Sequence, residues 1–207
     1  MQFVPSAWKY AIPLGIIGIV LLFVLPPAGL VGIFGAVGIL FFFRDPDRSI
    51  PDTGIVSPAD GRVSVIRETE DGIQIGVYMG VSDVHVNRAP LSGCVRTRTH
   101  RSGGHRPAFS KDSEYNERVR YQLETTYGPV FVDQIAGSFA RRITPYVAPD
   151  ENIERGQRIG HIAFGSRADV TIPTDQKDFE VTVAIGDSVR AGESILLQRT
   201  EKAGEKG

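Results

Sequence analysis

No charged residue occurs between Ala11 and Phe43, an apolar run that is interrupted only by the tandem prolines Pro26 and Pro27. About 20 helical residues cross the roughly 30 Å core of a bilayer. The whole run is therefore too long for one span, and each half is somewhat short for a span of its own. Tandem prolines remove two backbone donors and break a helix between the halves. We therefore predict a membrane-associated helical hairpin over residues 1–43, with full spanning and shallow insertion both open.

Two other interpretations of the apolar run fit less well. A cleaved signal peptide has a shorter apolar core followed by a small-residue cleavage site, and a buried helix of a soluble protein shows one polar face. Neither feature is present. Lys9 before the run and Arg44 and Arg48 after it suit a cytoplasmic location for both ends. The expected location is the cell membrane, with the rest of the chain on the cytoplasmic side.

Residues 44–207 have a different pattern, in which apolar and polar residues alternate over short runs separated by Gly, Pro and Asp. This period of two is typical of half-buried strands. We predict a mainly β (α+β) protein, in which a compact β-sandwich or barrel domain over 44–207 follows the helical hairpin. The runs with the strand pattern are 62–67, 73–77, 119–125, 130–135, 159–164, 170–172, 179–183 and 194–198.

Composition excludes several classes of function. The 23 Lys and Arg residues against 24 Asp and Glu give a net charge of −1, without the basic excess of a nucleic-acid-binding protein. The single cysteine, Cys94, excludes an intramolecular disulfide and a zinc site built from paired cysteines. His100 and His105 belong to a glycine-rich stretch, which is a poor frame for the three or four ligands of zinc. We expect neither a nucleic-acid partner nor a metal.

Three separate segments of the β-rich part carry reactive side chains, namely Asp60, His85 and Ser166. An aspartate before a glycine is a common turn residue, and a lone histidine is more often structural than catalytic. Together, a hydroxyl, an imidazole and a carboxylate are the residue types of nucleophilic catalysis. Because such triads are recognised by geometry, these residues alone leave the structural and the catalytic interpretation open.

Six motifs, in order along nearly the whole chain, resemble the short-form phosphatidylserine decarboxylase proenzymes, a pyruvoyl-dependent family that includes archaetidylserine decarboxylases. Six linked motifs are far more specific than any single one. They are Phe42-Phe43-Arg44-Asp45-Pro46 with Arg48 and Pro51, Ser57-Pro58-Ala59-Asp60-Gly61 with Val63, residues 83–93, Asn116-Glu117-Arg118, residues 134–137 with 140–143, and residues 160–167.

The resemblance implies a chain that cuts itself and acts on a phospholipid. The Ser166 hydroxyl attacks the carbonyl of Gly165, and the resulting ester eliminates, so that Ser166 becomes a covalent pyruvoyl group (pyruvic acid) at the start of an α chain, residues 166–207. The β chain, residues 1–165, keeps the hairpin. The pyruvoyl group then forms a Schiff base with phosphatidylserine, the electron sink for loss of CO₂, which yields phosphatidylethanolamine. The two chains stay together as a heterodimer, and a dimer of these is left open.

The resemblance also implies roles for His85 and Asp60. His85 takes the proton of the Ser166 hydroxyl, general-base help that is typically worth about 10²–10⁴-fold, and Asp60 orients its imidazole. Long-form members carry a second histidine three residues after the one that matches His85, commonly taken as the base. This position is Arg88 here. We expect His85 to act in both self-cleavage and decarboxylation, with a different proton acceptor in short forms as the alternative.

Several alternatives accompany this interpretation. Gly137–Ser138 is a second Gly-Ser bond, but family members generally have an apolar residue at the position of Ser138, so the cut is expected before Ser166. Residues 186–193 resemble the hairpin of lipoyl-type domains without their modified lysine, which indicates shared β architecture in a lipoyl-like C-terminal hairpin only. A membrane-tethered serine peptidase using Asp60, His85 and Ser166 would stay one chain. An archaeal member would act on archaetidylserine, whose headgroup is identical.

Overall fold

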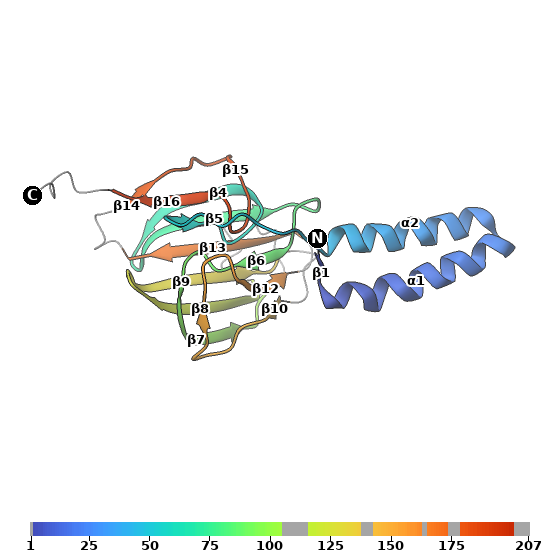
Figure 1. Ribbon diagram of the computed structural model, residues 1–207, viewed down its shortest axis with the longest axis horizontal. Helices are drawn as coiled ribbons and strands as arrows, with labels where there is room; N and C mark the ends of the chain where they lie inside the picture. Colours follow the sequence, from blue (N-terminus) through green and yellow to red (C-terminus); the bar gives the residue numbers. More distant parts are fainter. Residues whose placement is uncertain (1, 105–115, 138–142, 163–164, 174–178, 201–207) are drawn as a thin grey trace, which may run out of the picture. The chain divides into compact units, whose positions relative to one another are not determined.

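A computed structural model describes residues 2–104, 116–137, 143–162, 165–173 and 179–200, which fall in two compact units, Met1–Asp47 and Arg48–Gly207 (Figure 1). The first unit is a helical hairpin whose open end is closed by two short antiparallel strands. Its elements are β1 (Gln2–Phe3), α1 (Pro5–Val24), α2 (Pro26–Phe42) and β2 (Arg44–Asp45). The predicted helical hairpin is confirmed, and the break falls at Leu25, next to the tandem prolines.

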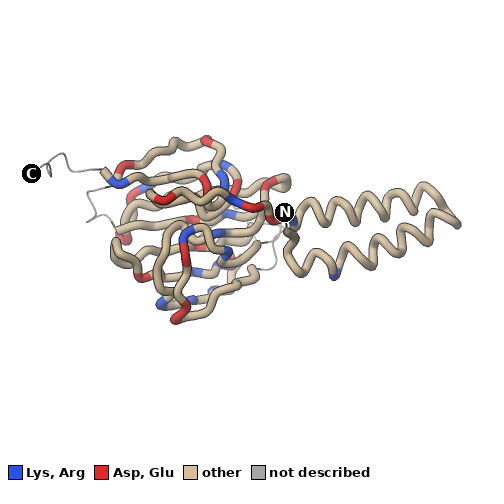
Figure 2. Tube along the Cα trace, in the orientation of Figure 1, with Lys and Arg blue, Asp and Glu red and all other residues tan. Residues whose placement is uncertain are grey.

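The first helix is longer than the uncharged run suggested. It begins at Pro5, includes Lys9 and has 20 residues, which corresponds to about 30 Å of helix. By length and composition it is able to cross a membrane, whereas α2 has 17 residues. Lys9 is the only charged residue on either helix (Figure 2). A proline at the first helical position is favourable because its missing N–H has no partner there in any case.

The two helices pack with their backbones in contact. A Cβ added to Gly29 would lie 2.5 Å from the backbone nitrogen of Leu22, and one added to Gly18 would lie 2.8 Å from that of Ile33. Small residues allow this close approach between helices. In an apolar environment, where there is no hydrophobic driving force between helices, such close packing favours their association. Position 29 therefore requires glycine, because any larger side chain would collide with the backbone of Leu22 on the other helix.

A leucine at Gly29 is expected to separate the helices. The Cβ position of Gly15 lies 3.7 Å from the Cβ of Ala36, within the range that a disulfide bridges. A Gly15→Cys/Ala36→Cys pair, with Cys94 replaced by serine, should therefore cross-link on oxidation. Adding Gly29→Leu should remove most of the cross-linking, as measured by mass after protease digestion.

The matched control for this experiment is Gly38→Leu. A Cβ at Gly38 meets no atom within 4 Å, so this variant should cross-link as readily as the parent pair. Equal cross-linking in the Gly29 and Gly38 variants would contradict the close packing at Gly29.

The second unit is built on an eight-stranded antiparallel sheet, in the order β11-β7-β8-β9-β13-β5-β4-β15 (Figure 1). The mainly β prediction for this part is confirmed. Its strands are β4 (Gly61–Thr69), β5 (Gly72–Met79), β7 (Gly93–Arg101), β8 (Arg118–Thr125), β9 (Gly128–Ile135), β11 (Asn152–Ile153), β13 (Ser166–Ile172) and β15 (Ser188–Val189).

Two three-stranded sheets complete the described part of this unit, in the orders β10-β12-β6 and β14-β16-β3. The first of them brings the segment before the expected cleavage bond next to the segment that follows His85. The strands are β3 (Ile55–Val56), β6 (Val86–Arg88), β10 (Ile143–Pro145), β12 (Arg158–Ile162), β14 (Phe179–Val181) and β16 (Ile195–Arg199).

The central strand β13 shows how the core is arranged. It lies between β9 and β5, and its residues alternate between two faces. Ala168 and Val170 belong to the apolar core, whereas Arg167 and Asp169 lie on the other face, buried and joined by two hydrogen bonds of 2.8 and 2.9 Å. Burial raises the pKa of Asp169 above its ordinary value, and the neighbouring Arg167 opposes this shift.

Candidate active site

Ser166, the expected nucleophile, is the first residue of β13 and is fully buried. It is paired with Met79 at the end of β5, and its Oγ lies 3.8 Å from the Sδ of Met79. A thioether is only a weak acceptor, so this contact positions the hydroxyl without taking its proton. Activation of the hydroxyl therefore has to come from another group.

Gly165, on the other side of the expected cut, has a left-handed backbone conformation with a φ of +56°. A Cβ at this position would meet nothing within 4 Å, so space alone does not require glycine. The backbone does favour it, because residues with a Cβ enter this region at a cost and glycine enters it freely. The residue before the expected cut therefore has a backbone conformation that glycine adopts most readily.

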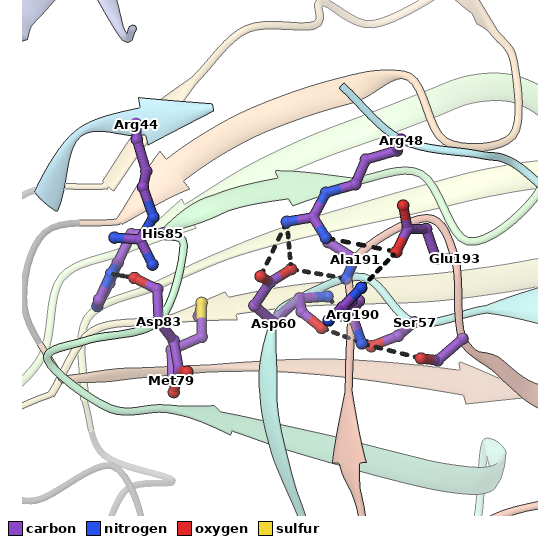
Figure 3. Close-up of polar contacts among 12 residues, drawn as sticks. Arg44, Arg48, Ser57, Asp60, Met79, Asp83, His85, Arg190, Ala191 and Glu193 are labelled. Atoms are coloured by element: carbon purple, nitrogen blue, oxygen red, sulfur yellow. Dashed lines mark hydrogen bonds and ion pairs between the residues drawn. The ribbon is translucent and has the colours of Figure 1, made fainter. Parts of the chain in front are cut away.

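His85 is buried in the loop between β5 and β6. Its Nδ1 lies 2.9 Å from the backbone carbonyl oxygen of Asp83 (Figure 3). A carbonyl only accepts, so in the neutral ring Nδ1 carries the hydrogen and Nε2 is the basic nitrogen. The backbone carbonyl of His85 accepts a hydrogen bond from the N–H of Ile162, at 3.2 Å, which joins this loop to the end of β12, close in sequence to Gly165.

Asp60 does not make the predicted contact with His85. Its carboxylate accepts hydrogen bonds from Nη2 of Arg48, at 2.8 and 2.9 Å, and from the backbone N–H of Ala191, at 2.8 Å (Figure 3). Among the described contacts, the acceptor at Nδ1 of His85 is the carbonyl oxygen of Asp83 and not the Asp60 carboxylate. The physical reason is the Arg48 side chain, which is 5% exposed and needs a charged partner at that depth.

Arg48 is the residue of this region that the sequence reasoning missed. In the sequence, Arg48 stands out only as a charge after the apolar run and as part of a family motif. Its Nη1 also lies 3.7 Å from Oε2 of Glu193. Because Ala191 and Glu193 follow the Gly165–Ser166 bond in sequence, the cluster joins segments from both sides of the expected cut. The motif that contains Arg48 was the available signal.

Breaking the Arg48–Asp60 pair is expected to destabilise the second unit. Arg48→Met leaves a carboxylate that is 14% exposed without its cation, and removing one partner of a buried pair costs about 3–5 kcal/mol. Thermal unfolding in detergent, in a Ser166→Ala background so that the chain stays whole, measures the loss. Adding Asp60→Asn should restore part of the stability.

Arg190→Met is the control for this prediction. The Arg190 side chain is 73% exposed and lies 3.7 Å from Glu193, and exposed pairs contribute about 0–1 kcal/mol. If Arg48→Met lowered the unfolding temperature no more than Arg190→Met does, the pair would not have the stabilising role given to it here.

Arg88, which replaces the second histidine of the long forms, is buried. Its Nη1 donates to the carbonyl of Gly156, at 2.9 Å, and its backbone N–H donates to that of Pro58. A guanidinium remains protonated and cannot accept the hydroxyl proton. Arg88 therefore connects loops and leaves the base function to another residue.

The other residues singled out above have less to do with this site. Ser138 and His105 lie outside the described residues. His100 lies 2.9 Å from a carboxylate oxygen of Glu117. Within the described ranges, no group of three or more His, Cys, Asp and Glu side chains is arranged to hold a metal ion.

Comparisons with known proteins identify the class to which this fold and site belong. A family model described as phosphatidylserine decarboxylase matches residues 38–197. A protein of Halobacterium salinarum named as an archaetidylserine decarboxylase proenzyme is 51% identical over 195 residues, 94% of this chain and 97% of that protein. A phosphatidylserine decarboxylase proenzyme of Streptomyces griseus is 46% identical over 158 residues, 76% of this chain and 72% of the relative.

The chain therefore belongs to the phosphatidylserine decarboxylase family. It is a decarboxylase by family, which sets aside the serine-peptidase alternative. The proenzyme names of the relatives imply self-cleavage within the family.

Proposed function

We propose that this chain is a self-processing, pyruvoyl-dependent decarboxylase, which converts a serine phospholipid into the ethanolamine phospholipid and CO₂. The observation that carries the proposal is the Gly165–Ser166 bond. It joins a glycine with a φ of +56° to a fully buried serine at the start of a central strand. This bond lies within the family match.

In the proposed self-cleavage, Oγ of Ser166 attacks the carbonyl carbon of Gly165, and the amide nitrogen leaves that carbon, so the peptide bond becomes an ester. His85 takes the hydroxyl proton at Nε2 and returns it to the leaving nitrogen, consistent with the tautomer that the Asp83 carbonyl favours. Elimination of the Gly165 carboxylate, followed by hydrolysis with release of ammonia, converts Ser166 into the pyruvoyl group. The products are chains 1–165 and 166–207.

The surroundings of Ser166 fit such a group. The position is fully buried, with the soft side chain of Met79 beside it, so bulk water is kept from a reactive carbonyl. The group supplies a ketone that condenses with the substrate amine and withdraws electrons from the bond to the carboxylate. The contacts of Asp60 with the N–H of Ala191 and of Arg48 with Glu193 link the two proposed chains after the cut.

The proposed substrate is a membrane lipid. Phosphatidylserine is the first candidate, from the family description and the Streptomyces relative. Archaetidylserine is the second, because the Halobacterium relative matches 94% of this chain. The α1 helix is long and apolar enough for a span, which supports anchoring to the cell membrane. Lys9, Arg44 and Arg48 flank the apolar run, and such positive charges favour the cytoplasmic side for the decarboxylase unit.

Reconstitution in vesicles that contain either serine lipid tests the proposal. CO₂ should be released from at least one of them, and a carbonyl reagent such as hydroxylamine should block the release. Cleaved, folded protein that released no CO₂ from either lipid would overturn the proposal. The lipid that is turned over faster identifies which lipid tails the substrate carries.

A further inference from the structure

A polar cavity of about 230 Å³ lies on the face of the eight-stranded sheet opposite to the apolar core. We call it the arginine pocket, because its wall contains Arg67 of β4, Arg101 of β7, and Arg118 and Arg120 of β8. Thr171 also lines it. Since side chains alternate along β13, Thr171 faces away from the side of Ser166 and lies five residues farther on, roughly 17 Å along the strand. The pocket is therefore separate from the cleavage bond.

The charge balance of the arginine pocket is positive. Four arginines line it, against one carboxylate, that of Asp71. The buried Asp133 is paired with Arg120 through hydrogen bonds of 2.8, 2.9 and 3.2 Å. The other buried carboxylate of this face, Asp169, is paired with Arg167, which is outside the wall. Positive charge in the wall thus exceeds what the described carboxylates of this face neutralise.

A second observation concerns the Nε donor of Arg118, which belongs to the wall of the pocket. Its Nε is buried and has no hydrogen-bond acceptor among the described residues. The neighbouring carboxylates have other partners, since Glu117 contacts His100 and Asp133 contacts Arg120. Buried donors in native proteins nearly always have an acceptor, so an unmatched one indicates an acceptor from outside the residues that the structure describes.

The floor and walls of the pocket are held in place before any ligand binds. Gln74 donates from Nε2 to Asp169, at 2.8 Å, and its Oε1 accepts from Nε of Arg67, at 2.7 Å. Arg120 is fixed by its forked contact with Asp133. Side chains that are already positioned lose little freedom on binding, which favours affinity.

We propose that the arginine pocket binds a phosphate-class anion, either free phosphate or the phosphodiester of a lipid headgroup. Guanidinium groups match phosphate oxygens with two parallel hydrogen bonds, which a compact ammonium cannot do. Arg118 and the exposed Arg101 supply the positive charge that the carboxylates of this face do not neutralise. Arg120 and Arg67 form the rest of the basic wall. This site goes beyond the decarboxylase reaction and does not depend on it.

Calorimetric titration of the purified full chain in detergent tests the proposal, with inorganic phosphate and, separately, with glycerophosphoethanolamine as a tail-free phosphodiester. Saturable binding of at least one is expected. Binding of phosphate alone identifies a free anion as the ligand, and binding of the diester alone identifies a lipid headgroup. Arg118→Gln and Arg101→Gln should each weaken binding by about tenfold or more, because each removes charge-assisted hydrogen bonds.

The matched control is Arg96→Gln, an exposed arginine of β7 outside the pocket, which should bind as the parent does. A melting experiment separates binding from folding. The ligand should raise the unfolding temperature of the parent and of the Arg96 variant, but not that of Arg118→Met. Absence of saturable binding of both probes, or equal binding in the parent and the Arg118 and Arg101 variants, would overturn the proposal.

Discussion

Replacing Ser166 with alanine is expected to leave the chain in one piece and to abolish CO₂ release. The hydroxyl is both the proposed nucleophile and the source of the pyruvoyl carbonyl, so no neighbouring group can replace it. Because Ser166 is fully buried and its Oγ makes only a 3.8 Å contact with Met79, the smaller side chain should still fold. Gel electrophoresis and the decarboxylation assay measure the two losses.

Ser138→Ala is the control, since it removes the hydroxyl of the other Gly-Ser bond in the family motifs. It should be cut and active. A Ser166→Ala chain that was still cut, together with an uncut Ser138→Ala chain, would move the reaction to Gly137–Ser138.

Replacing His85 with alanine is expected to slow self-cleavage by about 10²–10⁴-fold, the usual worth of a general base. The ring is buried, and its Nδ1 is held by the carbonyl of Asp83, which presents Nε2 as the basic nitrogen. The rate is measured on newly synthesised chains as the fraction cut against time.

Two variants decide whether this effect belongs to His85. Asp83→Asn keeps the backbone carbonyl, and its side-chain oxygen is still able to accept from the N–H of Gly80, so cleavage should be nearly unchanged. His161→Gln replaces another buried histidine, whose Nδ1 lies 2.7 Å from the hydroxyl of Tyr146. If the His161 variant lost cleavage and the His85 variant did not, the base would be His161.

The sequence was sufficient to predict the hairpin and most of the long strands. The tandem prolines predicted the break between α1 and α2, and the alternating runs predicted β4, β5, β8 and β9 to within two residues at each end. The helix α1 begins at Pro5, within the predicted hairpin of residues 1–43 but before the uncharged run that begins at Ala11. One lysine, Lys9, lies within a helix that is otherwise apolar.

The longest strand outside the predicted runs is β7, Gly93–Arg101. Its last six residues are exposed and polar, so it has no alternation from which to recognise a strand. It forms because its backbone pairs with β8 and β11. Backbone pairing leaves no trace in side-chain hydropathy, which is why an exposed strand of this kind escapes prediction.

The candidate site was predictable as a set of residues but not as a set of contacts. Motifs pointed to Asp60, His85 and Ser166, and residue types alone favoured pairing the carboxylate with the imidazole. The structure pairs Asp60 with Arg48 and the ring with a backbone carbonyl. A backbone acceptor has no sequence signature, and a guanidinium competes for a buried carboxylate more strongly than a neutral ring does.

The most direct test of the central claim is the intact mass of the purified wild-type protein. Two species are expected, residues 1–165 and residues 166–207. The smaller one should be lighter than its serine-ended form by one ammonia and resistant to amino-terminal sequencing. A single uncut chain that still decarboxylates the lipid, or a small chain that begins with an unmodified serine, would contradict this claim.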